Sequence, residues 1–260
     1  MLRKIRIVLA AIFFVIITLL LLGLTGKLQT WFGWMPGLQL PQSALAKNFI
    51  AVIAMVVLTL VMGRVYCSII CPLGVFQDIV SWLGGKKGKT EGRFHYRKKN
   101  TWLRFGMLVV FAVLMALGFY EIACVIAPYS EYSTIVRGLF PPFAERNVPI
   151  LVASVAIFIV IVVLSWKGGR TWCNNICPIG TALSLFSRFS FFAPTIDKDK
   201  CVNCDSCEKQ CKASCIDVTK HKIDHSRCVS CMNCIDTCHK GAITYKLRYA
   251  SKIKNKNNQQ

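Results

Sequence analysis

Four long apolar segments restrict what this chain can fold into more than any other feature. They cover about residues 5–24, 49–65, 103–122 and 148–166. Roughly 20 apolar residues in a helix span a lipid bilayer, so each segment is a candidate membrane helix. A cleaved signal peptide is the alternative for the first segment, but its apolar run is long and no clear cleavage site follows. We therefore predict four transmembrane helices, the first of them uncleaved.

The charge of the chain fits this class once its distribution is considered. The 260 residues carry a formal net charge of +20, which often indicates a nucleic-acid partner. Because 54% of the residues are hydrophobic and gathered in blocks, a nucleic-acid partner and an ordinary soluble enzyme are both excluded. Nine Lys and Arg residues lie in and beside the connection between the second and third segments, against two in each of the connections 26–48 and 121–147. The positive-inside rule then places both termini in the cytoplasm, with the basic surplus facing the lipid headgroups of the inner membrane.

The strongest metal-binding signal is a cysteine run that occurs twice. Cys201, Cys204, Cys207 and Cys211 are spaced C-x2-C-x2-C-x3-C, and Cys228, Cys231, Cys234 and Cys238 repeat that spacing. This spacing is typical of bacterial ferredoxins with two 4Fe–4S clusters, in which the fourth Cys of each run ligates the other cluster. The predicted ligand sets are Cys201, Cys204, Cys207 with Cys238, and Cys228, Cys231, Cys234 with Cys211.

Zinc is the alternative ligand for these cysteines, but zinc sites usually pair two C-x2-C units rather than using unbroken runs of four. The Pro that commonly follows the fourth Cys is absent, since Lys212 and His239 stand there. Cys215 and Cys124 fall outside both runs and are expected to be packed thiols, with a ligand role for Cys215 as the alternative. No ligand role is expected for His221, His225 or His239.

A second cysteine pattern is an internal repeat at an offset of 106 residues. Residues 63–74 read GRVYCSIICPLG and residues 169–180 read GRTWCNNICPIG, with seven of twelve positions identical. Each stretch follows an even-numbered apolar segment, so the unit is two helices and then C-x3-C-P. Two helices return the chain to the same side, which predicts a parallel repeat about an axis along the membrane normal.

The repeated stretches contain Cys67, Cys71, Cys173 and Cys177, which this topology brings to the cytoplasmic surface. A Pro is favoured at the first position of a helix, so Cys71 and Cys177 are expected near N-caps, where the helix dipole favours a thiolate. A short amphipathic helix on the inner face is expected after Cys71. The role of the four thiols is open among one shared metal or iron–sulfur site, two dithiol pairs and copper binding, with buried apolar thiols as the structural alternative.

The remaining predictions concern smaller features. Asp78 and Glu121 are the membrane-proximal carboxylates worth naming as proton acceptors, although solvated carboxylates are the expected reading. Aromatic residues in the first outer connection indicate a segment at the membrane interface: Trp31, Phe32 and Trp34. The predicted organisation is a transmembrane domain over 1–190, an α+β two-cluster ferredoxin domain over 191–245 and a basic disordered tail over 246–260.

Taken together, these motifs resemble the NapH-type membrane ferredoxins, which are related to the NosR and CcoG membrane iron–sulfur proteins. The resemblance covers nearly the whole chain and rests on the four apolar segments, the paired GRx2Cx3CPxG stretches and the doubled ferredoxin run. It implies electron transfer between quinone and a partner redox protein, with the eight ferredoxin cysteines as cluster ligands and the four C-x3-C-P cysteines as a matched feature. A metal-reducing or assembly role of the CcoG kind, using the C-x3-C-P thiols, is the alternative.

The surplus charge also suggests where the ferredoxin domain rests. Residues 197–240 carry a net charge of +1 before clusters are added, and two oxidised clusters with their thiolates would make them acidic. We therefore expect this domain to dock against the basic membrane-proximal loops, close to the C-x3-C-P thiols.

Overall fold

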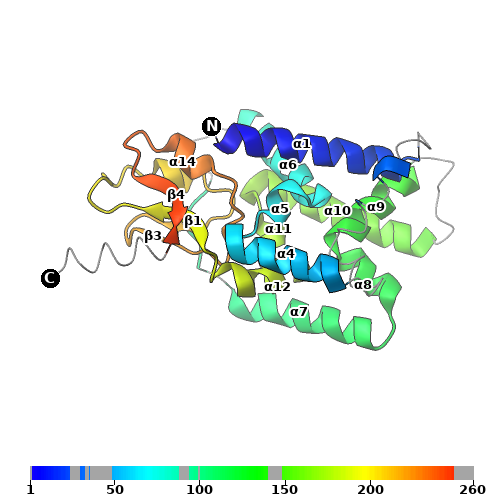
Figure 1. The fold of residues 1–260 in the computed structure, drawn as a ribbon. Helices are drawn as coiled ribbons and strands as arrows, with labels where there is room; N and C mark the ends of the chain where they lie inside the picture. Colours follow the sequence, from blue (N-terminus) through cyan, green and yellow to red (C-terminus); the bar gives the residue numbers. More distant parts are fainter. Residues whose placement is uncertain are drawn as a thin grey trace.

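The computed structural model describes residues 2–23, 30–32, 35, 49–87, 94–98, 100–139 and 148–248. Within these ranges a bundle of helices carries a small domain of short strands and helices at one end, beside the beginning of α1 (Figure 1). The predicted tail from residue 249, Trp34, most of the outer connections and the centre of the basic connection lie outside the described residues. The side chains of Glu121 and Cys124 also lie outside them.

The long helices follow the four apolar segments. They are α1 (Leu2–Leu21), α4 (Phe49–Met62), α7 (Thr101–Ala116) and α10 (Val148–Gly168). Among the described helices, α1 and α10 are long and apolar enough to cross a membrane, while α4 and α7 are shorter apolar helices. Large apolar side chains such as Ile53, Val109 and Val152 are exposed on their outer faces.

The sequence predicted a single helix for the third apolar segment, but the structure divides this segment into two helices. After α7 the backbone of Gly118 is left-handed, with φ of +81°, and α8 (Tyr120–Ile126) begins beyond it. Phe119 N–H donates to the Leu114 carbonyl over 3.0 Å and Gly118 N–H donates to that of Met115 over 3.3 Å. This pair of hydrogen bonds closes a helix that is followed by a left-handed glycine. The chain then forms α9 (Pro128–Leu139), which packs against α6, α8 and α10.

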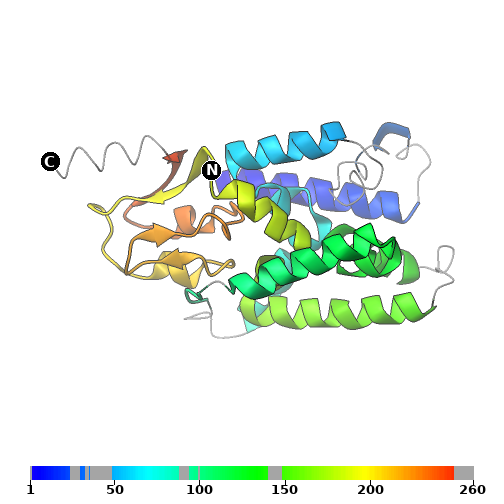
Figure 2. The ribbon, with the colours of Figure 1, turned by 90° about the horizontal axis from the view of Figure 1, so that it is seen from below.

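Each cysteine–proline segment forms a short helix, a turn and a second helix. α5 (Tyr66–Ile69) leads into α6 (Pro72–Lys87), and α11 (Thr171–Asn175) leads into α12 (Pro178–Ser187). α6 packs against α1 and α10, while α12 packs against α7 and α4 (Figures 1 and 2). The prediction of a separate surface helix after Cys71 is therefore wrong, because apolar side chains such as Leu73 and Val80 are buried among the long helices.

The small domain contains two antiparallel strand pairs and two single-turn helices. β1 (Phe192–Ile196) pairs with β4 (Ile243–Leu247), and Phe192 lies opposite Leu247. β2 (Ile216–Asp217) pairs with β3 (Lys222–Ile223). α13 (Ser206–Lys209) and α14 (Asn233–Thr237) contact each other and carry one cysteine from each ferredoxin run.

Hydrogen bonds to main-chain carbonyls fix this domain on the bundle. Arg170 N–H donates to the Lys212 carbonyl over 2.8 Å, and the Asn174 amide donates to that of Ala213 over 3.1 Å. In the opposite direction, Ser230 Oγ and Tyr245 Oη both donate to the Met62 carbonyl, over 3.1 and 3.0 Å. The expected docking near the C-x3-C-P segments is thus found, and neutral hydrogen bonds contribute to it in addition to the charges that the sequence suggested.

Candidate metal centres

The first predicted cluster set surrounds one cavity. Cys201, Cys204, Cys207 and Cys238 all line a space of about 240 Å³ in the small domain, together with residues such as His239 and Lys240. Cys204 is exposed, whereas Cys207 is buried. The fourth cysteine of the second run therefore joins the first three of the first run, and this set, which we call the outer set, reaches the protein surface.

The second predicted set also lies together, closer to the bundle. Cys211, Cys228, Cys231 and Cys234 line a smaller cavity of about 20 Å³. A 4Fe–4S cluster is larger than this space, so holding one requires the four side chains to turn outward around it. Lys212 and Ser230, the neighbours of Cys211 and Cys231 in the chain, are hydrogen-bonded to Arg170 and Met62 of the bundle, so this inner set faces the helices.

The backbone makes the same unusual turn in both cysteine runs. The residues two and four places after the first cysteine are left-handed: φ is 52° at Asn203 and 56° at Asp205, and 51° at Ser230 and 62° at Met232. Left-handed conformations are uncommon for residues other than glycine. Backbones that alternate right- and left-handed residues turn successive N–H groups into a concave surface, a device found around many Fe–S sites. The two loops are therefore built alike, and both suit an anionic cluster.

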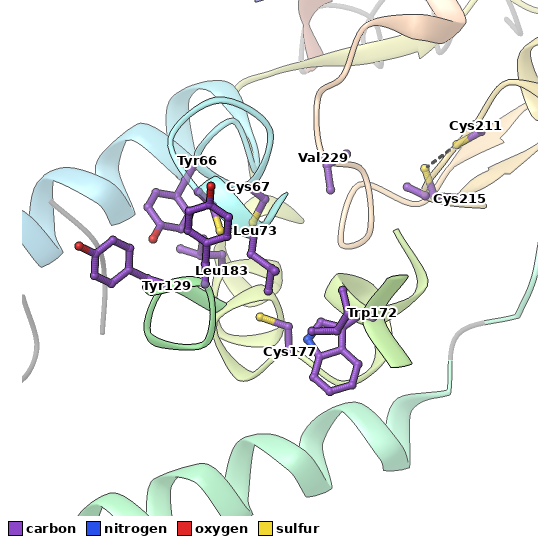
Figure 3. Close-up of a cluster of buried hydrophobic side chains, with 14 of the residues drawn as sticks. Tyr66, Cys67, Leu73, Tyr129, Trp172, Cys177, Leu183, Cys211, Cys215 and Val229 are labelled. Carbon is purple, nitrogen blue, oxygen red and sulfur yellow. Dashed lines mark hydrogen bonds between the residues drawn. The ribbon is translucent and has the colours of Figure 1, made fainter. Parts of the chain in front are cut away.

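Cys215 lies closer to the inner set than the sequence indicated. Its Sγ is 3.5 Å from Cys211 Sγ, as the dashed line in Figure 3 marks, and it lines the inner cavity. The hydrogen bond from the Cys215 thiol lowers the pKa of Cys211 below its ordinary value. Hydrogen bonds to ligand sulfurs are one of the means by which proteins set cluster potentials. Cys215 is thus a packed thiol, as predicted, that also contacts a predicted ligand.

The four C-x3-C-P cysteines gather inside the bundle. Cys67, Cys71, Cys173 and Cys177 are all buried, and Figure 3 shows Cys67 and Cys177 beside Leu73 and Leu183. The predicted N-cap of Cys177 is present, because its Sγ accepts a hydrogen bond of 3.4 Å from Gly180 N–H. However, burial and the nearby cysteine sulfurs raise the pKa of Cys177 well above its ordinary value. The helix dipole alone is therefore not enough to keep Cys177 ionised. A bound cation would stabilise the thiolate.

Two buried arginines join the repeated segments reciprocally. Arg64 from the first repeat donates from Nη2 to the Cys173 carbonyl of the second over 3.2 Å. Arg170 from the second repeat donates from Nη1 to the Cys67 carbonyl of the first over 2.5 Å. Both side chains are 0% exposed. The Arg of each GR pair thus positions the cysteine turn of the other repeat.

The same steric requirements explain the glycines at matching positions of the two repeats. Gly63 and Gly169 are left-handed, with φ of +76° and +66°, where α4 and α10 end. A Cβ on Gly74 would lie 2.3 Å from the Cys67 carbonyl oxygen, and one on Gly180 would lie 2.3 Å from that of Cys173. Only glycine permits so close an approach, so the repeated pattern encodes one tight turn in two copies.

Asp78 is not the solvated carboxylate that the sequence suggested. It is buried and forms ion pairs with Arg170 at 2.9 Å, with Lys212 at 3.5 Å and with Arg6. Although burial alone would raise the pKa of Asp78, the cations Arg170, Lys212 and Arg6 hold it well below its usual range. The ion pairs link α1, α6, the second cysteine segment and the small domain, so this carboxylate is structural rather than a proton acceptor.

A second buried carboxylate, Glu131, was not singled out in the sequence. It lies on α9, is 1% exposed and faces Ser154. Among the described residues, no ion pair to it is found.

A groove between α1 and α6 was also invisible in the sequence. Its volume is about 500 Å³, and its apolar wall includes Ala11, Phe14 and Trp82. Arg6 and Asp78 line its polar end. Lys212 and Asn233, which are the sequence neighbours of the inner-set residues Cys211 and Cys234, complete the lining. The groove therefore opens from the helices towards the inner set.

Among the described residues, no three His, Cys, Asp or Glu side chains converge as the ligands of one metal ion. This holds for the eight ferredoxin cysteines as well as for the four buried thiols. A multinuclear cluster is wider than a single ion, and its ligand sulfurs stand correspondingly farther apart.

Comparison with known proteins agrees with these motifs. A family model described as "4Fe-4S binding domain" matches residues 48–90 and 150–195, about a third of the chain and the two C-x3-C-P regions. The chain is 30% identical over 154 residues to the methylamine utilization ferredoxin-type protein MauN of Paracoccus denitrificans, covering 58% of this chain and 49% of MauN. It is 29% identical over 165 residues to the ferredoxin-type protein NapH of Escherichia coli, covering 62% of this chain and 52% of NapH.

An uncharacterised protein of Methanocaldococcus jannaschii is similar over a longer stretch. The two are 28% identical over 200 residues, which cover 76% of this chain and 70% of that protein. The matched stretch, by contrast, spans only about half the length of the MauN and NapH relatives. No solved structure matches it.

Proposed function

Since NapH and MauN ferredoxin-type proteins are its homologues, we propose that this chain is a membrane-bound iron–sulfur protein that passes electrons between the quinone pool and a partner redox protein. The 4Fe–4S binding domain and the ferredoxin-type homologues support an electron-transfer role. The quinone, the partner and the membrane topology are the proposed parts.

The eight ferredoxin cysteines are proposed to hold two 4Fe–4S clusters, one at the outer set and one at the inner set. Such clusters, when bound, supply one-electron transfer. The fit rests on two sets of four soft thiolates and on the matched left-handed loops at Asn203 and Ser230. The inner set faces the bundle, and the outer set reaches the surface at Cys204, so a partner protein would meet the outer set.

The observation that carries the quinone assignment is the groove between α1 and α6. Its wall is apolar, its end is charged, and its last residues adjoin Cys211 and Cys234. A quinone has a lipid-soluble body and a polar head with two carbonyl oxygens, which match the two ends of this groove. Arg6 and Lys212 lie where they would orient such a head beside the inner set.

A membrane location is supported by the apolar helices and by their exposed faces. α1 and α10 meet the length and composition of membrane spans, and large apolar side chains cover the outer surfaces of all four long helices. We propose that α4 and α7 also cross the membrane, and that the C-x3-C-P turns and the ferredoxin domain lie on the cytoplasmic side.

The groove assignment is tested by filling it. Purified protein is mixed anaerobically with a reduced short-chain quinol, and the cluster signals are followed by visible and EPR spectroscopy. We expect reduction of the clusters, and we expect Ala11→Trp to slow it at least tenfold, because an indole would occupy the space proposed for the quinone. Val109→Trp, on the exposed face of α7, is the matched control and should reduce at the normal rate.

Two results would overturn the assignment. If the clusters stay oxidised at every quinol concentration, with dithionite still reducing them, quinol is not the donor. If quinol reduces the wild type and Ala11→Trp equally fast, quinol reacts elsewhere on the protein.

A further inference from the structure

Arg64 is a fully buried cation for which the described residues provide no carboxylate partner. Its guanidinium donates to Asn174 Oδ1 over 2.8 Å and to the Ser226 carbonyl over 3.3 Å, in addition to the Cys173 carbonyl. All of these acceptors are neutral. Its counterpart Arg170, by contrast, is paired with Asp78. A guanidinium keeps its proton even when buried, and a buried charge without a counter-charge is strongly unfavourable.

The nearest group that can become an anion is a cysteine. Arg64 Nη2 lies 3.8 Å from Cys67 Sγ, and the Cys173 thiol donates to Gln77 Oε1 over 3.3 Å. Two buried donors of neighbouring side chains, Gln77 Nε2 and Trp172 Nε1, have no acceptor. Sulfur anions at this place would pair with Arg64, and turning the Gln77 amide over would present its unused Nε2 to the Cys173 sulfur.

All four thiols are buried, and burial disfavours the charged form of a thiol when nothing is bound to it. Metal binding reverses this, because a thiol that ligates a metal loses its proton. Four soft thiolates from two matched turns are suited to iron–sulfur clusters or to zinc. The donor set, the unpaired cation and the orphaned donors therefore all fit a thiolate-bound metal centre of net negative charge.

From these contacts we infer that Cys67, Cys71, Cys173 and Cys177 jointly hold a third iron–sulfur cluster, with Arg64 as its counter-ion. Iron–sulfur is favoured over zinc because Arg64 connects this site with the ferredoxin domain. The same guanidinium contacts the Cys67 thiol and the carbonyl of Ser226, two residues before Cys228 of the inner set. The site is thus placed to exchange single electrons with the inner set: one centre gains the electron that the other loses, and no bond or proton is transferred.

The existence of the site is independent of the proposed function, whereas its electron exchange with the inner set rests on it. The first test is therefore metal content. Iron and acid-labile sulfide are measured per chain in anaerobically purified protein, and zinc and copper are measured in the same samples. Two ferredoxin clusters account for about eight irons. We expect about ten to twelve, and we expect Cys67→Ser/Cys173→Ser to fall to about eight with the ferredoxin EPR signals retained.

Cys124→Ser, which removes a cysteine from none of the three groups, is the matched control and should keep the wild-type iron content. About eight irons in the wild type, or an unchanged content in the double variant, would overturn the inference. Stoichiometric zinc or copper that disappears with the double variant would overturn it in favour of a mononuclear or metal-handling site. Failure of quinol to reduce the protein would leave these metal measurements unaffected.

A second variant covers the case in which the cysteine variants do not fold. Arg64→Gln keeps all four thiols but removes the positive charge beside them. A cluster that gains an electron becomes more negative, so losing this cation should lower the midpoint potential of the additional EPR signal in a redox titration, and Arg3→Gln should not. An Arg64 that merely supports packing would leave that potential unchanged, and this result would contradict its role as counter-ion.

Discussion

The arginines show most clearly how single residues differ from their expected roles. The surplus of basic residues indicated membrane orientation and contact with lipid headgroups. Several of these residues are instead buried, among them Arg6, Arg64, Arg104 and Arg170. Their guanidinium groups reach main-chain carbonyls or Asp78, and both Arg64 and Arg104 donate to the Ser226 carbonyl. The positive charge near the end of the bundle therefore also holds the ferredoxin domain in place.

Asp78→Asn is expected to destabilise the protein strongly. The substitution leaves Arg6, Arg170 and Lys212 buried or half-buried without their shared counter-charge, and removing one partner of a buried ion pair costs about 3–5 kcal/mol. Thermal unfolding monitored by cluster absorbance in detergent measures this loss.

Asp236→Asn is the control for that experiment. Asp236 forms a partly exposed pair with Arg3 at 3.4 Å, and exposed pairs contribute only about 0–1 kcal/mol. Equal losses of thermal stability in the two variants would show that the buried Asp78 ion pairs stabilise the fold no more than an exposed pair does.

The two sets of four cysteines could be proposed at this scale, because their spacing is typical of two-cluster ferredoxins, and each set does line one cavity. Asp78 and Arg64 could not. Whether a charged side chain is solvated or buried depends on elements that are distant in sequence, such as Arg170 or Ser226.

Among the elements, the cysteine–proline turn is the part whose sequence and conformation correspond most closely. Its left-handed glycine ends a long helix, its arginine reaches the other copy, and its second glycine admits a carbonyl oxygen against the next helix. The sequence repeat therefore preserves a packing geometry as well as two thiols.

Gly74→Ala and Gly180→Ala are expected to destabilise the protein by about 1–3 kcal/mol each, the usual range for overpacking a filled site. The added methyl group of each would meet a cysteine carbonyl oxygen at 2.3 Å and an arginine nitrogen at 2.8 or 2.6 Å. Thermal unfolding midpoints and the iron content of the purified variants would report the effect.

Gly106→Ala is the matched substitution on α7, where a Cβ would meet nothing within 4 Å. It should leave the midpoint unchanged or raise it, because alanine is favoured over glycine by about 1 kcal/mol inside a helix. Gly74→Ala and Gly180→Ala proteins as stable as Gly106→Ala would refute the close-approach argument.

The long helices illustrate the limits of prediction at this scale. Hydropathy located all four apolar segments, yet it could not show that Gly118 divides the third or that α6 and α12 pack between other helices. Apolar residues are the same signal whether they face lipid or another helix.

Across the whole molecule, the candidate sites follow one another in space from the bundle to the surface of the small domain. The groove and the four buried thiols lie on the helix side, the inner set follows at the docking interface, and the outer set reaches the far surface. Under the proposed function, docking of the ferredoxin domain would therefore be required for electron transfer as well as for stability.

Docking is expected to weaken as the pH falls below about 6.5. Burial lowers the pKa of His225 to about 4 in the folded protein, against an ordinary value of 6.5. Above pH 6.5 the imidazole is neutral in both the docked and the released domain, so it costs nothing. Between pH 6.5 and 4 the released domain binds the additional proton, and each unit of pH costs up to about 1.4 kcal/mol.

Protease sensitivity of the domain junction between pH 5.0 and 8.0 measures this effect. His225→Gln cannot bind the proton and should flatten the acid side of the profile. The Ser187 hydroxyl donates over 3.1 Å to the main-chain carbonyl of residue 225 and not to its imidazole, so this hydrogen bond persists in the variant. Identical pH profiles for the two proteins would show that another group governs docking.

Cysteine spacing and hydropathy, which are local in the chain, were sufficient to identify a ferredoxin-type domain after apolar helices and to propose which cysteines share a cluster. The folded chain decided the rest: the reciprocal arginines, the ion pairs of Asp78, the groove beside the inner set and the unpaired charge of Arg64. These features depend on contacts between residues more than 70 positions apart, such as Arg6 with Asp78 and Arg64 with Cys173. Only the packing of the helices determines which distant groups meet and which charges lose their water.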